Sequence, residues 1–368
     1  MKQSILAGLS ALLLAVFLPM ALLSPAEAAE PETKMVIWDT AAAAESEADL
    51  QDAEPEAETA AEPETPDDAP EAETASAASA QPAAAWDEAT TVSLLTEGGV
   101  VSLSLREYLT GVVLSEMPAS FSAEALKAQA VAARTFTLKK LEASKHADAD
   151  LCADSACCQA WTSREALAEK LGSAFSQYWQ KAAEAVTGTD GLVLTYGGQL
   201  IDAVYFSCSG GSTEDAVAVW GGDVPYLQAV ESPGEEISKK FETQVTVPLA
   251  QFRQILEAAD LDVWFSGSAD SWFGPCSRTE GGGVATWEIG GQSFTGTQLR
   301  SLFSLNSANF TISAGDSEIV FIVSGYGHRV GMSQYGAEAM ARAGSDFEEI
   351  LLHYYTGVTL TRMAPDQG

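Results

Sequence analysis

Hydrophobic and polar residues alternate in two short runs, Thr91–Leu95 and Val100–Leu105, on either side of Gly98-Gly99. A period of two is typical of β-strands, and a glycine pair between two such runs favours a tight turn. This stretch therefore predicts a β-hairpin.

The period changes to that of a helix directly after this hairpin. Four apolar residues share one helical face, namely Leu105, Leu109, Val112 and Val113. Ser104 and Glu107 have the spacing of a capping box, and Pro118 cannot continue a helix. We expect a helix from Ser104 to about Met117.

The remaining pattern mixes helices with further hairpins. Helices are expected over 122–143, over 163–186 in two pieces around Gly172, and over 248–258, 298–305, 334–343 and from 346, where Ser345 and Glu348 would form a capping box. Hairpins are expected at 192–196 with 200–206 and at 284–289 with 292–295, single strands at 310–313 and 319–324, and a surface loop over 264–282. No strict βαβ rhythm is present, so the prediction is an α+β fold in one large domain with a substrate groove.

The first part of the chain has a different character. Lys2 precedes an apolar run from Ile5 to Leu23, and Ala26-Glu27-Ala28 offers small residues for cleavage, so residues 1–28 are interpreted as an export signal. The alternative is an uncleaved membrane anchor. Residues 29–88 are rich in Ala, Glu and Pro and predict a disordered acidic linker, which leaves 89–368 as the folded domain.

Charge narrows the possible partners. Residues 30–88 carry 18 acidic side chains and one lysine, which accounts for −17 of the chain's net charge of −33. The remaining residues are also acidic, with no extended basic stretch, so nucleic-acid binding is not expected. Together with the signal, this predicts an exported protein that works outside the cytoplasm.

Glu116 continues the apolar stripe of the first helix and comes one residue before its expected end. A carboxylate at the rim of an apolar surface is partly desolvated, which favours its protonated form and suits a general acid. The alternative is a helix-end glutamate that simply reaches solvent.

Gln129 and Arg134 interrupt the small apolar residues of the second helix. A buried arginine keeps its charge and needs an anionic or carbonyl partner. Arg134 is therefore a candidate to orient Glu116 or to hold substrate, and a structural salt bridge is the alternative.

One imidazole and three thiols lie close together in the sequence, at His146, Cys152, Cys157 and Cys158. Such ligands in a short loop suit tetrahedral zinc. A disulfide is the alternative, although adjacent Cys157 and Cys158 would form a strained bridge and the chain has an odd number of cysteines.

Two glycine-containing segments are candidate sugar-binding loops. The first follows a strand and contains Tyr205, Ser207, Ser209 and Gly210; the second contains His328, Gln334 and Tyr335. Hydroxyls and open backbone at a turn suit sugar hydroxyls. A serine nucleophile is also conceivable, but the Gly-x-Ser-x-Gly pattern is missing.

These segments together resemble the stage II sporulation protein D family, which includes proteins called amidase enhancers. The resemblance runs from about residue 100 to 362. It rests on residues 106–113 (REYLTGVV), Glu116-Met117, 124–135 (EALKAQAVAART), 209–213 (SGGST), Trp220-Gly221, 225–227 (PYL) and 327–337 (GHRVGMSQYGA).

The resemblance implies a lytic transglycosylase that cleaves glycan strands of peptidoglycan already stripped of peptides. Glu116 matches the family's single catalytic acid, and Arg134 matches a conserved arginine. It also implies zinc at His146, Cys152, Cys157 and Cys158, although Cys157 stands where such members have a histidine.

Two rival functions remain at this point. Relatives described as stimulating an amidase favour a glycan-binding activator that works with a cell-wall amidase or a membrane partner. A hydrolase would instead need a second carboxylate, for which Asp202 and Glu214 are candidates.

Overall fold

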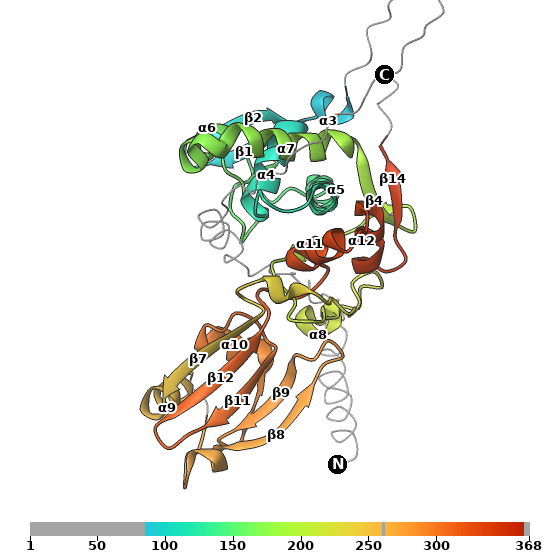
Figure 1. Ribbon diagram of the computed structural model, residues 1–368. Helices are drawn as coiled ribbons and strands as arrows, with labels where there is room; N and C mark the ends of the chain where they lie inside the picture. The colour runs from blue at the N-terminus through green and yellow to red at the C-terminus, as the bar shows by residue number, and fades with distance from the viewer. Residues whose placement is uncertain (1–84, 260–261, 364–368) are drawn as a thin grey trace, which may run out of the picture. The chain divides into compact units, whose positions relative to one another are not determined.

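The computed structural model describes residues 85–259 and 262–363. The expected signal and nearly all of the expected linker lie outside these residues. Within the described part of the chain, none of the helices has both the length and the apolar character needed to span a bilayer. Helices and mostly antiparallel strands alternate in it, and the α+β expectation is confirmed (Figure 1).

The first half of the described chain is mainly helical. Its helices are α3 (Trp86–Ala89), α4 (Leu105–Glu116), α5 (Ala123–Leu141), α6 (Arg164–Leu171), α7 (Phe175–Gly188) and α8 (Ala216–Trp220). Its strands are β1 (Thr91–Thr96), β2 (Gly99–Ser104), β3 (Leu151–Cys152), β4 (Leu192–Tyr196), β5 (Gln199–Leu200) and β6 (Tyr205–Phe206). The predicted first hairpin is β1–β2, and the predicted division near Gly172 separates α6 from α7.

Helix α5 lies at the centre of this half, where α4, α7 and strand β4 contact it (Figure 1). The C-terminal helices α11 (Gln334–Arg342) and α12 (Phe347–Tyr354) also pack against α5. Its residues from Ala125 to Ala133 are buried apart from Lys127, and most of them are alanine. Such small side chains allow several elements to approach one helix closely.

A second hydrophobic core is built entirely from residues 245–323. It lies among β7 (Glu242–Pro248), α9 (Leu249–Ala258), β8 (Phe273–Arg278), β9 (Val284–Ile289), β10 (Gln292–Thr295), α10 (Gly296–Phe303), β11 (Phe310–Ala314) and β12 (Glu318–Ser324). The strands form two sheets, of order β11-β12-β7 and β10-β9-β8. The Gly325 N–H donates to the Phe241 carbonyl at 2.9 Å, so the two ends of this segment meet.

The closure of this segment brings two distant stretches of sequence together. Strand β13 (Met332–Ser333) pairs in parallel with β6, with Met332 opposite Tyr205. The last strand, β14 (Thr359–Arg362), pairs with β4. The two candidate sugar-binding loops therefore lie beside each other.

Three local predictions were wrong. Residues 200–206 are not one strand, because only Gln199–Leu200 pairs with β4 and Tyr205–Phe206 pairs with β13 instead. Strand β8 occupies part of the expected 264–282 loop, because β9 supplies its hydrogen-bonding partner. The last capping box uses Asp346 and Glu349 rather than the pair one residue earlier, so α12 begins at Phe347.

The position of Arg134 favours a structural salt bridge over the expectation that it binds substrate or orients Glu116. Arg134 is fully buried, and its guanidinium donates to both carboxylate oxygens of Asp87, at 2.8 and 2.5 Å. It also donates to the carbonyls of Val186 and Leu192, each at 3.1 Å. The N–H donors of Arg134 are thus used inside the protein, as expected for a structural salt bridge. Asp87, expected at the end of the linker, is 1% exposed and belongs to the packed structure.

Replacement of Asp87 by alanine should lower the free energy of unfolding by about 3–5 kcal/mol, because it leaves the Arg134 charge buried without its counter-ion. Urea denaturation would measure this loss. The neighbouring Glu88→Ala is the matched control: its pair with Arg106 is about half exposed, at 45% and 49%, and should contribute less than about 1 kcal/mol. Equal losses in both variants would contradict the prediction.

Candidate functional site

Glu116 is the last residue of α4, and its side chain is almost completely enclosed, with 6% exposed. The apolar stripe that precedes it, from Leu105 to Val113, is fully buried. Glu116 therefore does not simply reach solvent, as one interpretation held. Its Oε1 accepts the Ala160 N–H at 2.9 Å.

Tight packing between α4 and the chain after the cysteines brings Ala160 to Glu116. Gly111 lies in the middle of α4, where a Cβ would come within 2.5 Å of Trp161 Nε1. Only glycine therefore allows the indole to lie against the helix. One turn later, the Ser115 hydroxyl donates to Thr162 Oγ1 at 3.0 Å. These contacts hold residues 160–162 along the end of α4.

Gln159 was not predicted as a site residue, yet its buried amide joins three hydroxyls around Glu116. Its Nε2 donates to Thr137 Oγ1 at 2.9 Å and to the Tyr108 hydroxyl at 3.2 Å. Its Oε1 accepts the Tyr205 O–H at 2.7 Å. Because an amide oxygen cannot donate, the Tyr205 proton is committed to Gln159 and the phenol oxygen can only accept elsewhere.

Two phenols with raised pKa values adjoin the Glu116 carboxyl. Burial raises the pKa of Tyr205 well above its ordinary value, and the charge of Glu116 adds to that rise. Burial likewise raises the pKa of Tyr108, with Glu116 among the further contributions. Both phenols are therefore neutral at ordinary pH. Glu116 is the one carboxyl group named in this cluster.

His328 lies on the other side of Tyr205. Its Nδ1 accepts the Val330 N–H at 3.1 Å, so the ring proton is on Nε2, which donates to the Tyr205 carbonyl at 3.1 Å. The ring packs against Phe206 and Trp220. Burial, assisted by the charge of Arg300, lowers the pKa of His328 to about 3. His328 is thus a neutral positioning group and not an acid near neutral pH.

Ser209 and Gly210 hold the loops together, which differs from the expectation that they contact sugar. Ser209 is completely buried, and its N–H and hydroxyl donate to the Glu235 carboxylate at 2.5 and 2.8 Å. Gly210 has φ of +72°, and a Cβ there would lie 2.6 Å from Gly325 N. Only glycine permits this close approach of the two loops.

The other predicted loop residues meet across the β6–β13 pair. The Ser207 carbonyl accepts the Tyr335 N–H at 3.0 Å, and the Tyr335 ring lies edge-on to Phe121. Gln334 is 2% exposed, and its Nε2 has no hydrogen-bond partner within the described part of the chain. A buried amide N–H without a partner is costly, so Gln334 stays a candidate for binding a ligand.

The two candidate second carboxylates each have partners of their own. Glu214 is buried, and its Oε1 accepts from Arg329 at 3.0 Å and from the Gly283 N–H at 2.8 Å. Asp202 is partly exposed and lies 4.0 Å from Lys140 Nζ. Glu214 serves a structural ion pair, so the hydrolase interpretation loses one of its two named acids.

The four predicted metal ligands converge. The ligand atoms of His146, Cys152, Cys157 and Cys158 all lie within 4.8 Å of one another, and all are unpaired thiols or imidazole. His146 Nε2 is 3.5 Å from Cys158 Sγ and 3.7 Å from Cys157 Sγ. Tetrahedral zinc with ordinary bond lengths requires nitrogen–sulfur separations of about 3.6 Å. The donor set and its geometry therefore fit a metal ion.

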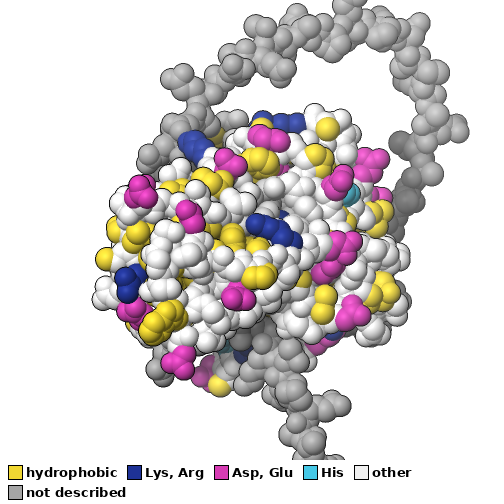
Figure 2. All heavy atoms as spheres, turned by 90° about the horizontal axis from the view of Figure 1, so that it is seen from below, with side chains coloured by type: hydrophobic (Ala, Val, Ile, Leu, Met, Phe, Trp, Pro, Cys, Tyr) yellow, Lys and Arg dark blue, Asp and Glu magenta, His cyan; other side chains and the backbone are white. Residues whose placement is uncertain are grey.

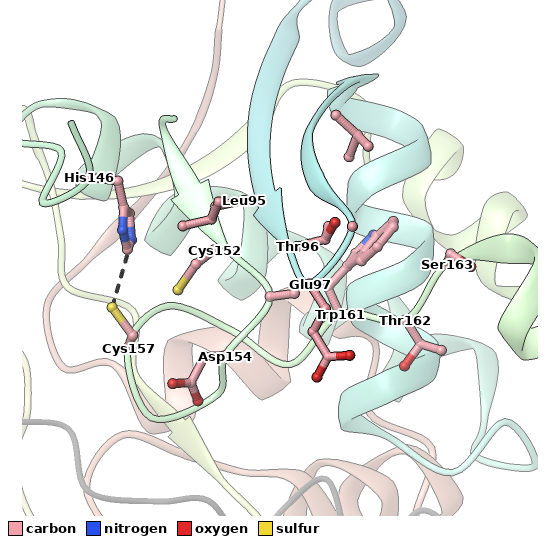
Figure 3. Close-up of a pocket in the computed structure, with 13 residues that line it drawn as sticks. Leu95, Thr96, Glu97, His146, Cys152, Asp154, Cys157, Trp161, Thr162 and Ser163 are labelled. Carbon is pink, nitrogen blue, oxygen red and sulfur yellow. Dashed lines mark hydrogen bonds between the residues drawn. The ribbon is translucent and has the colours of Figure 1, made fainter. Parts of the chain in front are cut away.

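An open groove of about 910 Å³ lies beside this cluster (Figure 3). His146, Cys152 and Cys157 line one part of it, and Trp161 and Thr162 line another. Glu97 and Asp154 add carboxylates to its wall. The groove thus runs from the metal ligands to the residues that flank Ala160.

Comparison with known proteins identifies the family. The family model described as "Stage II sporulation protein" matches residues 96–196. Stage II sporulation protein D of Bacillus amyloliquefaciens is 39% identical over 265 residues, which cover 71% of this chain and 75% of the relative. The protein of that name from Bacillus subtilis (strain 168) is 39% identical over 266 residues, covering 71% and 76%.

A third relative carries a different name. The "Amidase enhancer" of Bacillus subtilis (strain 168) is 30% identical over 309 residues, 69% of this chain but only 40% of the relative. The α+β fold and these matches agree with the resemblance noted in the sequence. The chain belongs to the stage II sporulation protein D family.

We expect the His328 ring to stay neutral and protonated on Nε2 between about pH 5 and 8, since its pKa of about 3 lies below the ordinary histidine value. Below about pH 6.5 the unfolded chain binds a proton that the folded chain does not. The neutral His328 ring therefore lowers the free energy of unfolding as the pH falls below about 6.5. It has no such effect above that pH. Long-range ¹H–¹⁵N NMR reports the tautomer directly. A ring that titrates between about pH 5 and 8 would rule this out.

Proposed function

We propose that this protein is an exported lytic transglycosylase that cleaves peptide-stripped glycan strands of peptidoglycan, in sporulation or in cell-wall remodelling. The observation that carries this proposal is the enclosed Glu116, held by the Ala160 N–H and flanked by two neutral phenols. The name of the first two relatives supports a role in sporulation, and the expected export signal supports action outside the cytoplasm.

One carboxyl group is enough for this reaction. Protonated Glu116 gives its proton to the glycosidic oxygen as the bond from that oxygen to the anomeric carbon breaks. The resulting carboxylate then takes the proton of the sugar's own 6-hydroxyl, whose oxygen bonds to the anomeric carbon. The products are a free 4-hydroxyl end and a 1,6-anhydro end, and Glu116 is protonated again. No water enters, so no second carboxylate is required.

The surroundings of Glu116 suit both halves of this cycle. The Ala160 N–H stabilises the carboxylate after the first proton transfer. The Tyr205 oxygen, whose own proton is held by Gln159, can accept a hydrogen bond from a sugar hydroxyl. Gln334 offers an unused N–H to the same ligand, and His328 fixes the Tyr205 backbone. Ser207 and Tyr335 shape the adjoining loops.

The four-ligand cluster would hold zinc in a structural role. Three thiolates and one imidazole fill all four positions of tetrahedral zinc, which leaves none for substrate. Cys158 directly precedes Gln159 and Ala160 in the chain. The metal would thus brace the segment that contacts Glu116.

A second candidate function is a glycan-binding activator of a cell-wall amidase. The name of the amidase enhancer relative favours it. In that case Glu116 and the loops near His328 bind glycan without cutting it, and the partner is an amidase, with a membrane protein as a further possible partner.

Glu116→Gln keeps the size of the side chain but cannot give up a proton, so turnover of purified glycan strands should fall at least about 100-fold. Mass spectrometry of the wild-type products should find 1,6-anhydro ends, one water lighter than hydrolysis products. Glu107→Gln, on the exposed first turn of the same helix, is the control and should keep full activity.

Two results would overturn this proposal. Reducing ends in the wild-type products would indicate a hydrolase with a second acid. Absence of cleavage by wild-type protein, combined with amidase stimulation that survives in Glu116→Gln, would establish the activator.

Protein purified without chelator should contain close to one zinc ion per chain, and Cys157→Ser should remove most of it, because one thiolate of four is lost. Elemental analysis by mass spectrometry measures the metal. Cys276→Ser is the matched control, since Cys276 is exposed and outside the cluster. Wild-type protein without metal, together with a disulfide mapped to Cys152, would contradict the zinc site.

A further inference from the structure

The β1–β2 hairpin leaves an uncovered edge and uncovered aliphatic side chains. β2 is the outermost strand of the β2-β1-β3 sheet (Figure 1). Leu95 is 40% exposed, Val100 48% and Val101 37%. Leu95 and Val100 are direct cross-strand partners, so they form one exposed apolar pair. Every residue of β2 from Gly99 to Ser102 is exposed.

This edge lacks the features that usually prevent strand addition. β2 has the sequence Gly-Val-Val-Ser-Leu-Ser, without charge or proline, and it pairs with β1 in an unbroken register. Edge strands are normally interrupted by charges, prolines or bulges. Within the described chain, edge strand β8 has Pro275 and two register shifts, and edge strand β14 ends in Arg362. Edge strands β10 and β11 also lack charges and prolines, but the residues they expose are serine and threonine, whereas β2 exposes two valines.

The free N–H and C=O groups of an edge strand are satisfied best by another extended polypeptide. We propose that the β2 edge is a docking site for an extended, basic and apolar segment of a different protein, which adds as a further strand. Its aliphatic side chains would cover Val100 and Val101. This proposal does not depend on catalysis by Glu116.

The acidic side chains near the β2 edge favour a basic partner. Glu97 in the hairpin turn and Asp154 line the adjoining groove, and Glu107 follows β2 on the first turn of α4. The whole chain carries −33, so a second copy would bring like charge to this edge. Figure 2 views the molecule from below and so shows a different face, on which acidic side chains are interspersed with some lysines and arginines. A segment with lysine or arginine is attracted where a second copy is repelled.

The site adjoins the residues around Glu116. Leu95 and Val101 line the groove, as do Trp161 and Thr162, which follow Ala160 in the chain (Figure 3). Ala160 donates its N–H to Glu116. A strand bound at β2 would therefore lie next to the segment that positions the candidate acid.

The test uses the full purified chain and a labelled short peptide of alternating valine and lysine. A copy of this peptide with alternate backbone nitrogens methylated cannot form one row of strand hydrogen bonds. Fluorescence anisotropy measures binding, and hydrogen exchange measures protection of the amides of Gly99–Ser104. We expect saturable binding of the first peptide with slower exchange in β2, and no binding of the methylated copy.

Val100→Lys should weaken peptide binding at least about tenfold, because it removes the apolar pair with Leu95 and places a like charge against the peptide. Val217→Lys is the matched control: Val217 is 51% exposed but lies on helix α8, so binding should change less than about twofold. Folding of both variants is checked by circular dichroism, since both sites are about half exposed.

Four results would overturn the proposal. They are the absence of saturable binding, equal binding of the methylated copy, equal effects of the two lysine variants, and protection of β2 by purified glycan strands but not by peptide. Sedimentation velocity adds a fifth: a wild-type dimer that Val100→Lys dissociates would assign the edge to a second copy instead. Loss of glycan cleavage alone would bear on the proposed activity and not on this site.

Discussion

The buried ion pair between Arg134 and Asp87 is the interaction on which the arrangement around α5 depends. Arg134 joins α3 through Asp87, the end of α7 through Val186 and the start of β4 through Leu192. A guanidinium without solvent must be satisfied by fixed partners, so these elements have little freedom to shift relative to α5. Three residues later on the same helix, Thr137 accepts from Gln159. The pair thus holds the helix against which the candidate site is assembled.

A second buried arginine organises the loops. Arg329 has a φ of +67°, and its guanidinium donates to the carbonyls of Ser209, Ser212 and Gly281 and to Glu214. It therefore ties the β6 loop to the β13 loop and to the turn after β8. His328, directly before it, is brought to Tyr205. These hydrogen bonds offset the free-energy cost of the positive φ at Arg329.

The candidate metal ligands and the residues that contact the candidate acid are neighbours in one short segment of the chain. Cys157 and Cys158 end a turn in which both of their N–H groups donate to the Asp154 carbonyl. The next two residues, Gln159 and Ala160, contact Tyr205 and Glu116. A metal at the cluster would limit the motion of the same segment. The order of the cysteine loop and the position of the Glu116 carboxyl are therefore connected, because only Gln159 separates Cys158 from Ala160.

Much of the local structure could be predicted from the sequence by itself. The first hairpin, the helix that ends at Glu116, the division near Gly172 and the convergence of the His146 and cysteine side chains depend on residues close together in the chain. Periodicity, caps and short ligand spacings report such short-range preferences. The burial of Glu116 also followed from its place on the apolar stripe.

Only the tertiary structure decided the rest, because the partners are far apart in sequence. Arg134 could meet Glu116 or another acid, and folding brought it to Asp87, 47 positions away. Gln159 carries no local signal, and its bond to Tyr205 spans 46 positions. The pairing of β6 with β13 requires the whole second core to fold between them. A buried polar group takes whichever partner the packing of the entire chain leaves within reach, and periodicity contains no information about that choice.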